Sequence, residues 1–152
     1  MPLIEIKTLI KADLQTCFDL SRDIDFHKAS MAHSGEKAIA GKTSGLIGHG
    51  EWVTWEAKHF GIIQKLTSKI TEFDAPYYFV DEMVSGAFKS FRHEHRFQTK
   101  NGDTVMIDRF YFESPFGVFG KLANSLFLKR YMTKLLSIRN EHLKVKAEEI
   151  RL

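Results

Sequence analysis

The spacing of hydrophobic positions divides the chain into extended and helical segments. Residues 2–10 alternate between apolar and polar and predict a first strand. Residues 11–31 have apolar positions at helical spacing, with Asp13 as a candidate N-cap. An interruption at residues 21–25 divides this segment into two short helices. From residue 51 onward, alternating segments joined by tight turns predict a run of five strands.

Two dipeptide turns determine how four of these strands pair. Phe-Gly at 60–61 joins the first two strands and places Trp55 opposite Leu66. Asn-Gly at 101–102 is the strongest short hairpin signal and joins the last two strands. Because short hairpins connect neighbouring strands, the sheet is expected to be antiparallel.

The C-terminal part of the chain predicts one long amphipathic helix. Residues 118–149 contain no proline and, after Gly120, no glycine, while leucines recur at helical spacing between lysines and arginines. The helix must bury its apolar stripe on the sheet. We therefore expect an α+β fold in which six or seven antiparallel strands curve around a long C-terminal helix. Two short helices follow the first strand, and residues 1–152 form a single domain.

The segment 34–50 is rich in glycine and holds five of the ten glycines in the chain. Its fragment "GKTSG" is similar to a phosphate-binding loop, but Glu36 stands where that motif requires a glycine. Nucleotide binding is therefore not expected. The segment is interpreted either as a mobile flap over an opening or as a plain connector.

Composition and charge narrow the function classes. The 152 residues are 43% apolar and carry a net charge of +3, with basic and acidic residues intermixed, which does not favour nucleic-acid binding. No apolar run approaches the roughly 18 residues of a membrane span, so stable membrane insertion is not expected. The N-terminus lacks the features of a signal peptide, and we expect a cytoplasmic protein. Cys17 is the one cysteine and is expected to be a packed core thiol.

The strand "FKSFRHEHRF", residues 88–97, poses the main question about chemistry. Phe91, His93 and His95 share one face, while the other face is mostly charged. The turn at 101–102 places Asp108 opposite His95 on the inner face. A buried carboxylate is costly unless it is paired, and histidine is a natural partner.

Four interpretations of these inner polar residues remain open. They could form a satisfied polar pair in the core, or they could address the polar end of a ligand in an aromatic cavity. His95 could also act as a general acid or base oriented by Asp108. Finally, His93, His95 and Asp108 could bind a metal ion. No second ligand cluster supports a metal site, and we expect neither a metal nor a cofactor.

The preceding strand has a less certain register. A two-residue turn at 86–87 would place Asp81 on the outer face opposite Arg92, with Glu82 on the inner face. A bulge at Gly86 would reverse these orientations. Glu82 is therefore only a tentative neighbour of the inner polar residues.

Three blocks, "CFDLSRDIDFH", "YFVDEMVSGAFKSFRHEHRF" and "SPFGVFGKLANSLF", carry a family resemblance that extends over nearly the whole chain. The sequence resembles the START-like, pollen-allergen-like helix-grip superfamily (SRPBCC), and within it the bacterial branch of polyketide cyclase/dehydrase-like proteins. The resemblance implies a deep cavity between the sheet and the long helix. The residues that would face this cavity are Trp55, Phe91, His93, His95, Asp108 and Phe110.

The leading functional hypothesis is binding of an apolar or aromatic small molecule, such as a lipid-, quinone- or polyketide-like compound. The expected ligand-binding residues are Trp55, Leu66, Phe91, His93, His95, Met106, Asp108 and Phe110. One alternative is a cyclase, dehydratase or hydrolase that uses His95 with Asp108. Another is a protein-interaction module with a collapsed cavity.

Overall fold

The computed structural model describes residues 3–86, 88–113 and 127–151. Two short helices follow the first strand, and a long helix comes last, as predicted. The elements are β1 (Leu3–Ile10), α1 (Leu14–Ser21), α2 (Ile24–Ser30), the 3-10 helix η1 (Ala32–Ser34), β2 (Lys37–Gly41), β3 (Trp52–His59), β4 (Ile62–Asp74), β5 (Tyr78–Ser85), β6 (Ser90–Lys100), β7 (Asp103–Glu113) and α4 (Lys129–Arg151).

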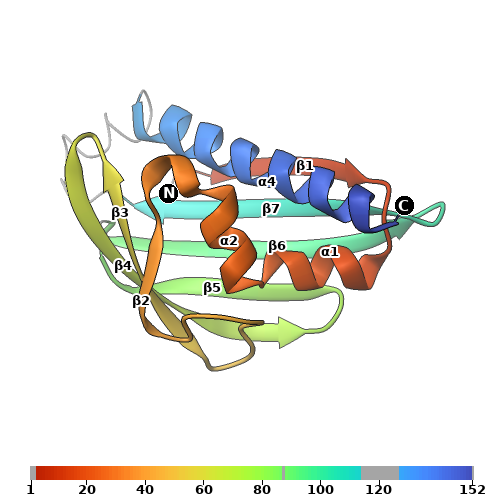
Figure 1. Ribbon diagram of the computed structural model, residues 1–152, viewed down its shortest axis with the longest axis horizontal. Helices are drawn as coiled ribbons and strands as arrows, with labels where there is room; N and C mark the ends of the chain where they lie inside the picture. The colour runs from red at the N-terminus through yellow and green to blue at the C-terminus, as the bar shows by residue number, and fades with distance from the viewer. Residues whose placement is uncertain (1–2, 87, 114–126, 152) are drawn as a thin grey trace.

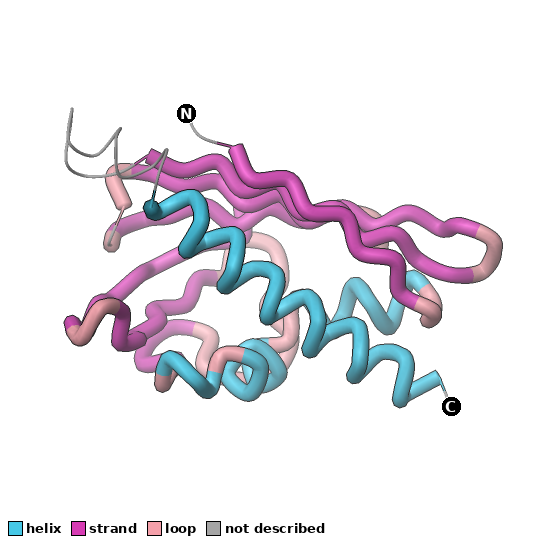
Figure 2. Tube along the Cα trace, turned by 90° about the horizontal axis from the view of Figure 1, so that it is seen from above, coloured by secondary structure: helices cyan, strands magenta, loops and turns pink. Residues whose placement is uncertain are grey.

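The seven strands form one antiparallel sheet in the order β1-β7-β6-β5-β4-β3-β2. The first strand therefore lies beside the last, and the other neighbours follow chain order. The sheet curves, and α4 runs along its inner side together with α1 and α2 (Figures 1 and 2). Within the described ranges, every helix is too short or too polar to cross a bilayer.

The two dipeptide turns form as the sequence predicts. All four residues at 60–61 and 101–102 have positive φ angles between 52° and 82°, which suits the tight turns of a twisted hairpin. Both predicted registers are confirmed, including the pairing of His95 with Asp108. Turn chemistry and alternation agree here, so each strand has only one register that buries its apolar face.

Part of the glycine-rich segment is an edge strand. Lys37–Gly41 forms β2 and pairs with β3 through a bulge between Ala38 and Ala40. Gly41 has a φ of 76°, and a side chain there would collide with the backbone carbonyl of Trp52. The glycine therefore permits close approach of two strands. The sequence analysis does not predict this strand, because the many glycines of the segment obscure the alternation of apolar and polar residues.

Of the two orientations that the sequence left open for β5, the structure has the one that does not follow from a two-residue turn. Asp81 pairs with His93, and Glu82 pairs with Arg92. The connection from Ser85 to Ser90 is longer than a tight hairpin, and Gly86 has a φ of 145°. The one-residue shift places Asp81 on the inner face and Glu82 on the outer face. Glu82 is therefore not a neighbour of the inner polar residues, in contrast to the orientation that a two-residue turn would give.

The long helix α4 packs on the inside of the sheet through one continuous stripe. The predicted start near Val118 lies outside the described residues, while the described part extends to Arg151. The buried residues of this stripe are Leu135, Leu136, Arg139, Asn140, Leu143 and Ala147. Two polar residues thus lie in the middle of an otherwise apolar face, where they need partners.

The first helix closes one end of the core. Phe18 is fully buried and makes edge-to-face contacts with aromatic rings on β4, β5 and β6. Cys17 is also buried, as predicted, and burial raises the pKa of its thiol to about 11. The hydroxyl of Thr104 on β7 donates to the carbonyl of Ala12 at 2.8 Å and ties the start of α1 to the sheet.

Replacing Thr104 by valine should destabilise the protein by about 1–3 kcal/mol, because the buried carbonyl of Ala12 loses its donor while the side-chain shape is kept. Urea unfolding would measure the loss. Thr99→Val is the control, because Thr99 pairs with Thr104 across the hairpin but is exposed. It should change stability by less than about 0.5 kcal/mol. Equal losses in the two variants would contradict the anchoring role of Thr104.

Candidate functional site

The described residues line a cavity of about 530 Å³ between the sheet, α2 and α4. Trp55 lines it from one packed cluster, and Leu66, Phe91 and Phe110 line it from another. Ligand pockets in proteins typically have volumes of about 300–1,000 Å³. The cavity is therefore large enough for a small organic molecule, and the collapsed cavity of the interaction-module hypothesis does not describe this structure.

Six of the eight residues expected to bind ligand line this cavity, namely Trp55, Leu66, Phe91, His93, His95 and Phe110. The other two lie behind the wall. Met106 is fully buried under α1, where Ser21 donates to its sulfur at 3.5 Å. Asp108 is fully buried beneath the histidines. Their assignment as ligand contacts is corrected, because a side chain from another element covers each of them.

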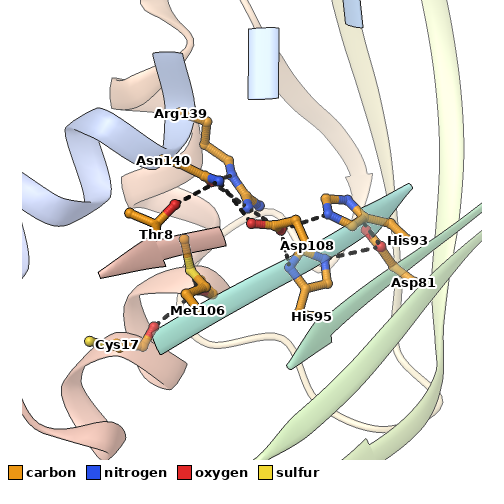
Figure 3. Close-up of polar contacts among 10 residues, drawn as sticks. Thr8, Cys17, Asp81, His93, His95, Met106, Asp108, Arg139 and Asn140 are labelled. Atoms are coloured by element: carbon orange, nitrogen blue, oxygen red, sulfur yellow. Dashed lines mark hydrogen bonds and ion pairs between the residues drawn. The ribbon is translucent and has the colours of Figure 1, made fainter. Parts of the chain in front are cut away.

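Asp108 is the centre of a polar network that joins the sheet to α4 (Figure 3). Its Oδ1 accepts hydrogen bonds from Arg139 Nη2 at 2.7 Å and from His93 Nε2 at 2.8 Å. Its Oδ2 accepts from Asn140 Nδ2 at 2.8 Å. Asn140 also accepts from Arg139, so the two helix residues support each other. Each of these side chains is less than about a tenth exposed.

The two histidines have different partners from those predicted. His93 makes the short bond to Asp108, although it lies diagonally across the strands from it. The directly opposed His95 has its Nδ1 3.4 Å from Asp108 and no hydrogen bond there. The Nε2 of His95 instead contacts Asp81 Oδ1 at 3.3 Å. Asp81 thus replaces Asp108 as the carboxylate partner of His95.

Ring stacking accounts for this arrangement. The imidazole of His95 lies between the ring of Phe79, at a centroid distance of 4.1 Å, and the imidazole of His93, at 3.8 Å. Phe110 meets His93 edge-on. The aromatic wall therefore holds both imidazoles in place, and the inner polar residues are built into the cavity surface.

The electrostatics of this cluster follow from burial and charge. Burial alone would raise the pKa of Asp108, but the charge of Arg139 and the hydrogen bond from His93 hold that pKa well below its ordinary value. The pKa of Asp81 is also lowered, because its bond to His95 and nearby positive charge outweigh burial. Burial, together with the charge of His93, lowers the pKa of His95 to about 4. His95 is therefore neutral near pH 7.

Three functional residues were missed by sequence reasoning. Asp81 was not assigned to the site, because the sequence left open which face it occupies before Gly86. Arg139 and Asn140 were not assigned to the site, because the helix was predicted only from its leucines, with lysines and arginines between them. The available signal was their position, since they stand four residues after the buried Leu135 and Leu136 and so share their face.

Asp81, His93 and His95 carry potential metal-ligand atoms that lie within 4.8 Å of one another. The two imidazole planes, however, are only 27° apart and stacked. Their in-plane lone pairs therefore run side by side, whereas a metal needs donors that converge at about 2.0–2.2 Å. The geometry does not form a ready metal site, and the lack of a metal remains a prediction.

A second set of polar residues lines the cavity opposite the first. His27 Nε2 lies 2.8 Å from Glu36 Oε1, and its ring is 4.5 Å from that of Trp55. His59 Nδ1 lies 2.6 Å from the hydroxyl of Tyr131. Burial lowers the pKa of His59. These polar groups have partners within the protein.

The comparisons with known proteins concern the fold. No protein-family model matches the sequence, and a search of curated proteins finds no match. Among solved structures, TTHA0849 from Thermus thermophilus has a TM-score of 0.75 at 17% identity, covering 96% of this chain and 99% of that one. Ginseng major latex-like protein 151 from Panax ginseng has a TM-score of 0.70 at 16% identity, covering 96% and 97%. Ara h 8.0201 has a TM-score of 0.68 at 9% identity, covering 93% and 97%.

The fold is the helix grip. The resemblance to the START-like, pollen-allergen-like superfamily that the sequence suggested is confirmed at the level of fold. At identities this low, the similarity extends to architecture and not to activity. The cyclase/dehydrase-like branch stays a prediction.

Asp108→Asn should destabilise the protein by about 3–5 kcal/mol, because it leaves the buried guanidinium of Arg139 without a counter-charge. Denaturant unfolding would measure this loss. Asp103→Asn is the matched control on the same strand, since Asp103 pairs with Arg151 near the surface. The control should lose less than about 1 kcal/mol. A similarly small loss of stability in both variants would mean that water already hydrates Asp108 and Arg139.

His95→Gln should flatten the pH dependence of stability between pH 6.5 and about 4. In this pH window His95 is protonated in the unfolded chain but stays neutral in the folded wild type. The wild type therefore loses stability as the pH falls. The loss should reach at most about 1.4 kcal/mol per pH unit, and glutamine can still donate to Asp81 without titrating. Denaturant titrations at several pH values would test this. Parallel profiles for the two proteins would exclude a lowered His95 pKa.

Proposed function

We propose that this protein binds an apolar or aromatic small molecule in the cavity between its sheet and α4. The observation that carries the proposal is an aromatic-walled space of about 530 Å³ with a fixed polar group at one end. Natural ligand pockets have this composition, because apolar walls supply affinity and a few polar groups set orientation. Lipid-, quinone- and polyketide-like compounds are the ligand classes we consider.

Two features support binding over a purely structural cluster. Asp81, His93 and His95 line the cavity, so the polar network reaches the space where a ligand would lie. The anchoring carboxylate, Asp108, is hidden beneath them and already accepts three hydrogen bonds. The network thus separates into a structural half, centred on Asp108, and a half presented to the cavity.

An enzymatic role for His95 remains the second candidate. The neutral imidazole of His95 lines the cavity and is oriented by Asp81, which is a suitable arrangement for a general base. The Asp108 partner of the original hypothesis would act on His93 instead. Within the described residues, neither serine hydroxyl on the cavity wall is hydrogen-bonded to His93 or His95, so no activated nucleophile is formed and binding is the better-supported function.

Leu66→Trp should weaken binding of an apolar environment-sensitive dye by about tenfold or more, because the larger side chain fills the cavity. Fluorescence titration would measure the dissociation constant. Lys65→Trp is the matched control, since the neighbouring side chain is exposed on the other face of β4. It should bind the dye as the wild type does.

Circular dichroism and thermal unfolding would establish that both tryptophan variants remain folded. Dye binding that is absent from the wild type, or equally strong in both folded variants, would refute the proposed cavity binding. In either case the polar network would be left with a structural role only.

A further inference from the structure

The carboxylates around the cavity differ in whether an arginine binds them. Arg139 is matched by Asp108 at 2.7 Å, and Arg22 is matched by Asp19 at 3.0 Å. Each arginine on the cavity wall therefore already has its own carboxylate. Asp81 also lines the cavity, but histidines are its only ion-pair partners among the described residues. Apart from the two imidazoles, the buried cluster holds two aspartates and one arginine, and the arginine is bound to Asp108.

Asp81 is placed to present this charge to a ligand. Its side chain is 25% exposed, whereas that of Asp108 is 1% exposed. Its Oδ1 contacts His95 at 3.3 Å, which is a long hydrogen bond, and no bond within the described residues reaches Oδ2. Hydrogen-bonding capacity and negative charge thus remain at the wall of an apolar space. A carboxylate in such surroundings interacts strongly with any cation that comes close.

We propose that the cavity selects ligands that carry both an apolar part, about the size of an aromatic ring system, and a protonated amine. The ammonium group of such a ligand binds Asp81. This inference rests on the proposed binding function and names the class of ligand. The ammonium would give Asp81 a cationic partner and donate to its Oδ2, which receives no hydrogen bond from the described residues. A carboxylate ligand would meet a like charge at the same place.

The surroundings of Asp81 favour the same chemistry. Phe79 and Phe91 line the cavity on the strands that carry Asp81 and the histidines. The negative faces of aromatic rings attract organic cations, most strongly where water is excluded. Glu36 adds a further carboxylate on the opposite side, paired with His27. The two arginines on the wall are held by their own aspartates and are not free to bind an anionic ligand.

Three probes with one apolar body test the inference, namely naphthylmethylamine, naphthylmethanol and naphthoate. Isothermal titration at pH 7 should rank their affinities in that order for the wild type, with the amine about tenfold or more tighter than the alcohol. Asp81→Asn should remove the preference for the amine and leave the alcohol affinity within about threefold. Glu82→Gln is the matched control, because this carboxylate on the same strand pairs with Arg92 on the outer face. It should keep the ranking.

The outcomes separate this inference from the proposed function. If the three probes bind the wild type equally, or if naphthoate binds best, the amine preference is refuted while cavity binding stands. If Asp81→Asn folds and keeps the amine preference, Asp81 is not the group responsible and the inference also fails. If neither the probes nor the apolar dye bind the wild type, the proposed function itself fails. The wild-type ranking is decisive even if the Asp81 variant does not fold.

Discussion

The ionised carboxylate of Asp108 is the constraint on which the rest of the structure depends. It lies where the long helix packs on the sheet. Removing a carboxylate from water costs free energy unless its oxygens accept hydrogen bonds from the protein. Arg139 and Asn140 supply two donors from the helix and His93 supplies a third from the neighbouring strand. The helix is thereby held in one position over the sheet, which apolar packing alone would not specify.

The same interaction determines which polar groups line the cavity. Because Arg139 and His93 are engaged with Asp108, they are held in place at the end of the cavity. His95, stacked between His93 and Phe79, can then address only Asp81. The second carboxylate oxygen of Asp81 receives no hydrogen bond from the described residues, and Asp81 lines the cavity. A hidden structural carboxylate and an accessible one thus have different roles, although two stacked imidazoles are all that separates them.

How far the sequence predicted this arrangement depended on the local strength of each signal. The Asn-Gly turn at 101–102 specified the register of β6 and β7, and the inner face of that hairpin followed residue by residue. The connection after Ser85 has no comparable signal, so the face of Asp81 was left open. Arg139 and Asn140 could not be identified as partners of Asp108, because helical spacing shows which face they share but not which strand lies beneath it. The cavity volume depends on how side chains pack in three dimensions. The spacing of apolar residues along the sequence does not predict it.

The neighbouring positions of β1 and β7 have a consequence for the order in which this protein is assembled. Leu3–Ile10 can pair only with a strand about a hundred residues later in the chain, and α4 must then pack across both. Contacts so distant in sequence form late, since a long loop must close before they contribute any stability. On the ribosome the hairpin of β3 and β4 can form early. The Asp108 network and the described cavity wall need residues of α4 up to Asn140, so neither can form before that helix has been synthesised.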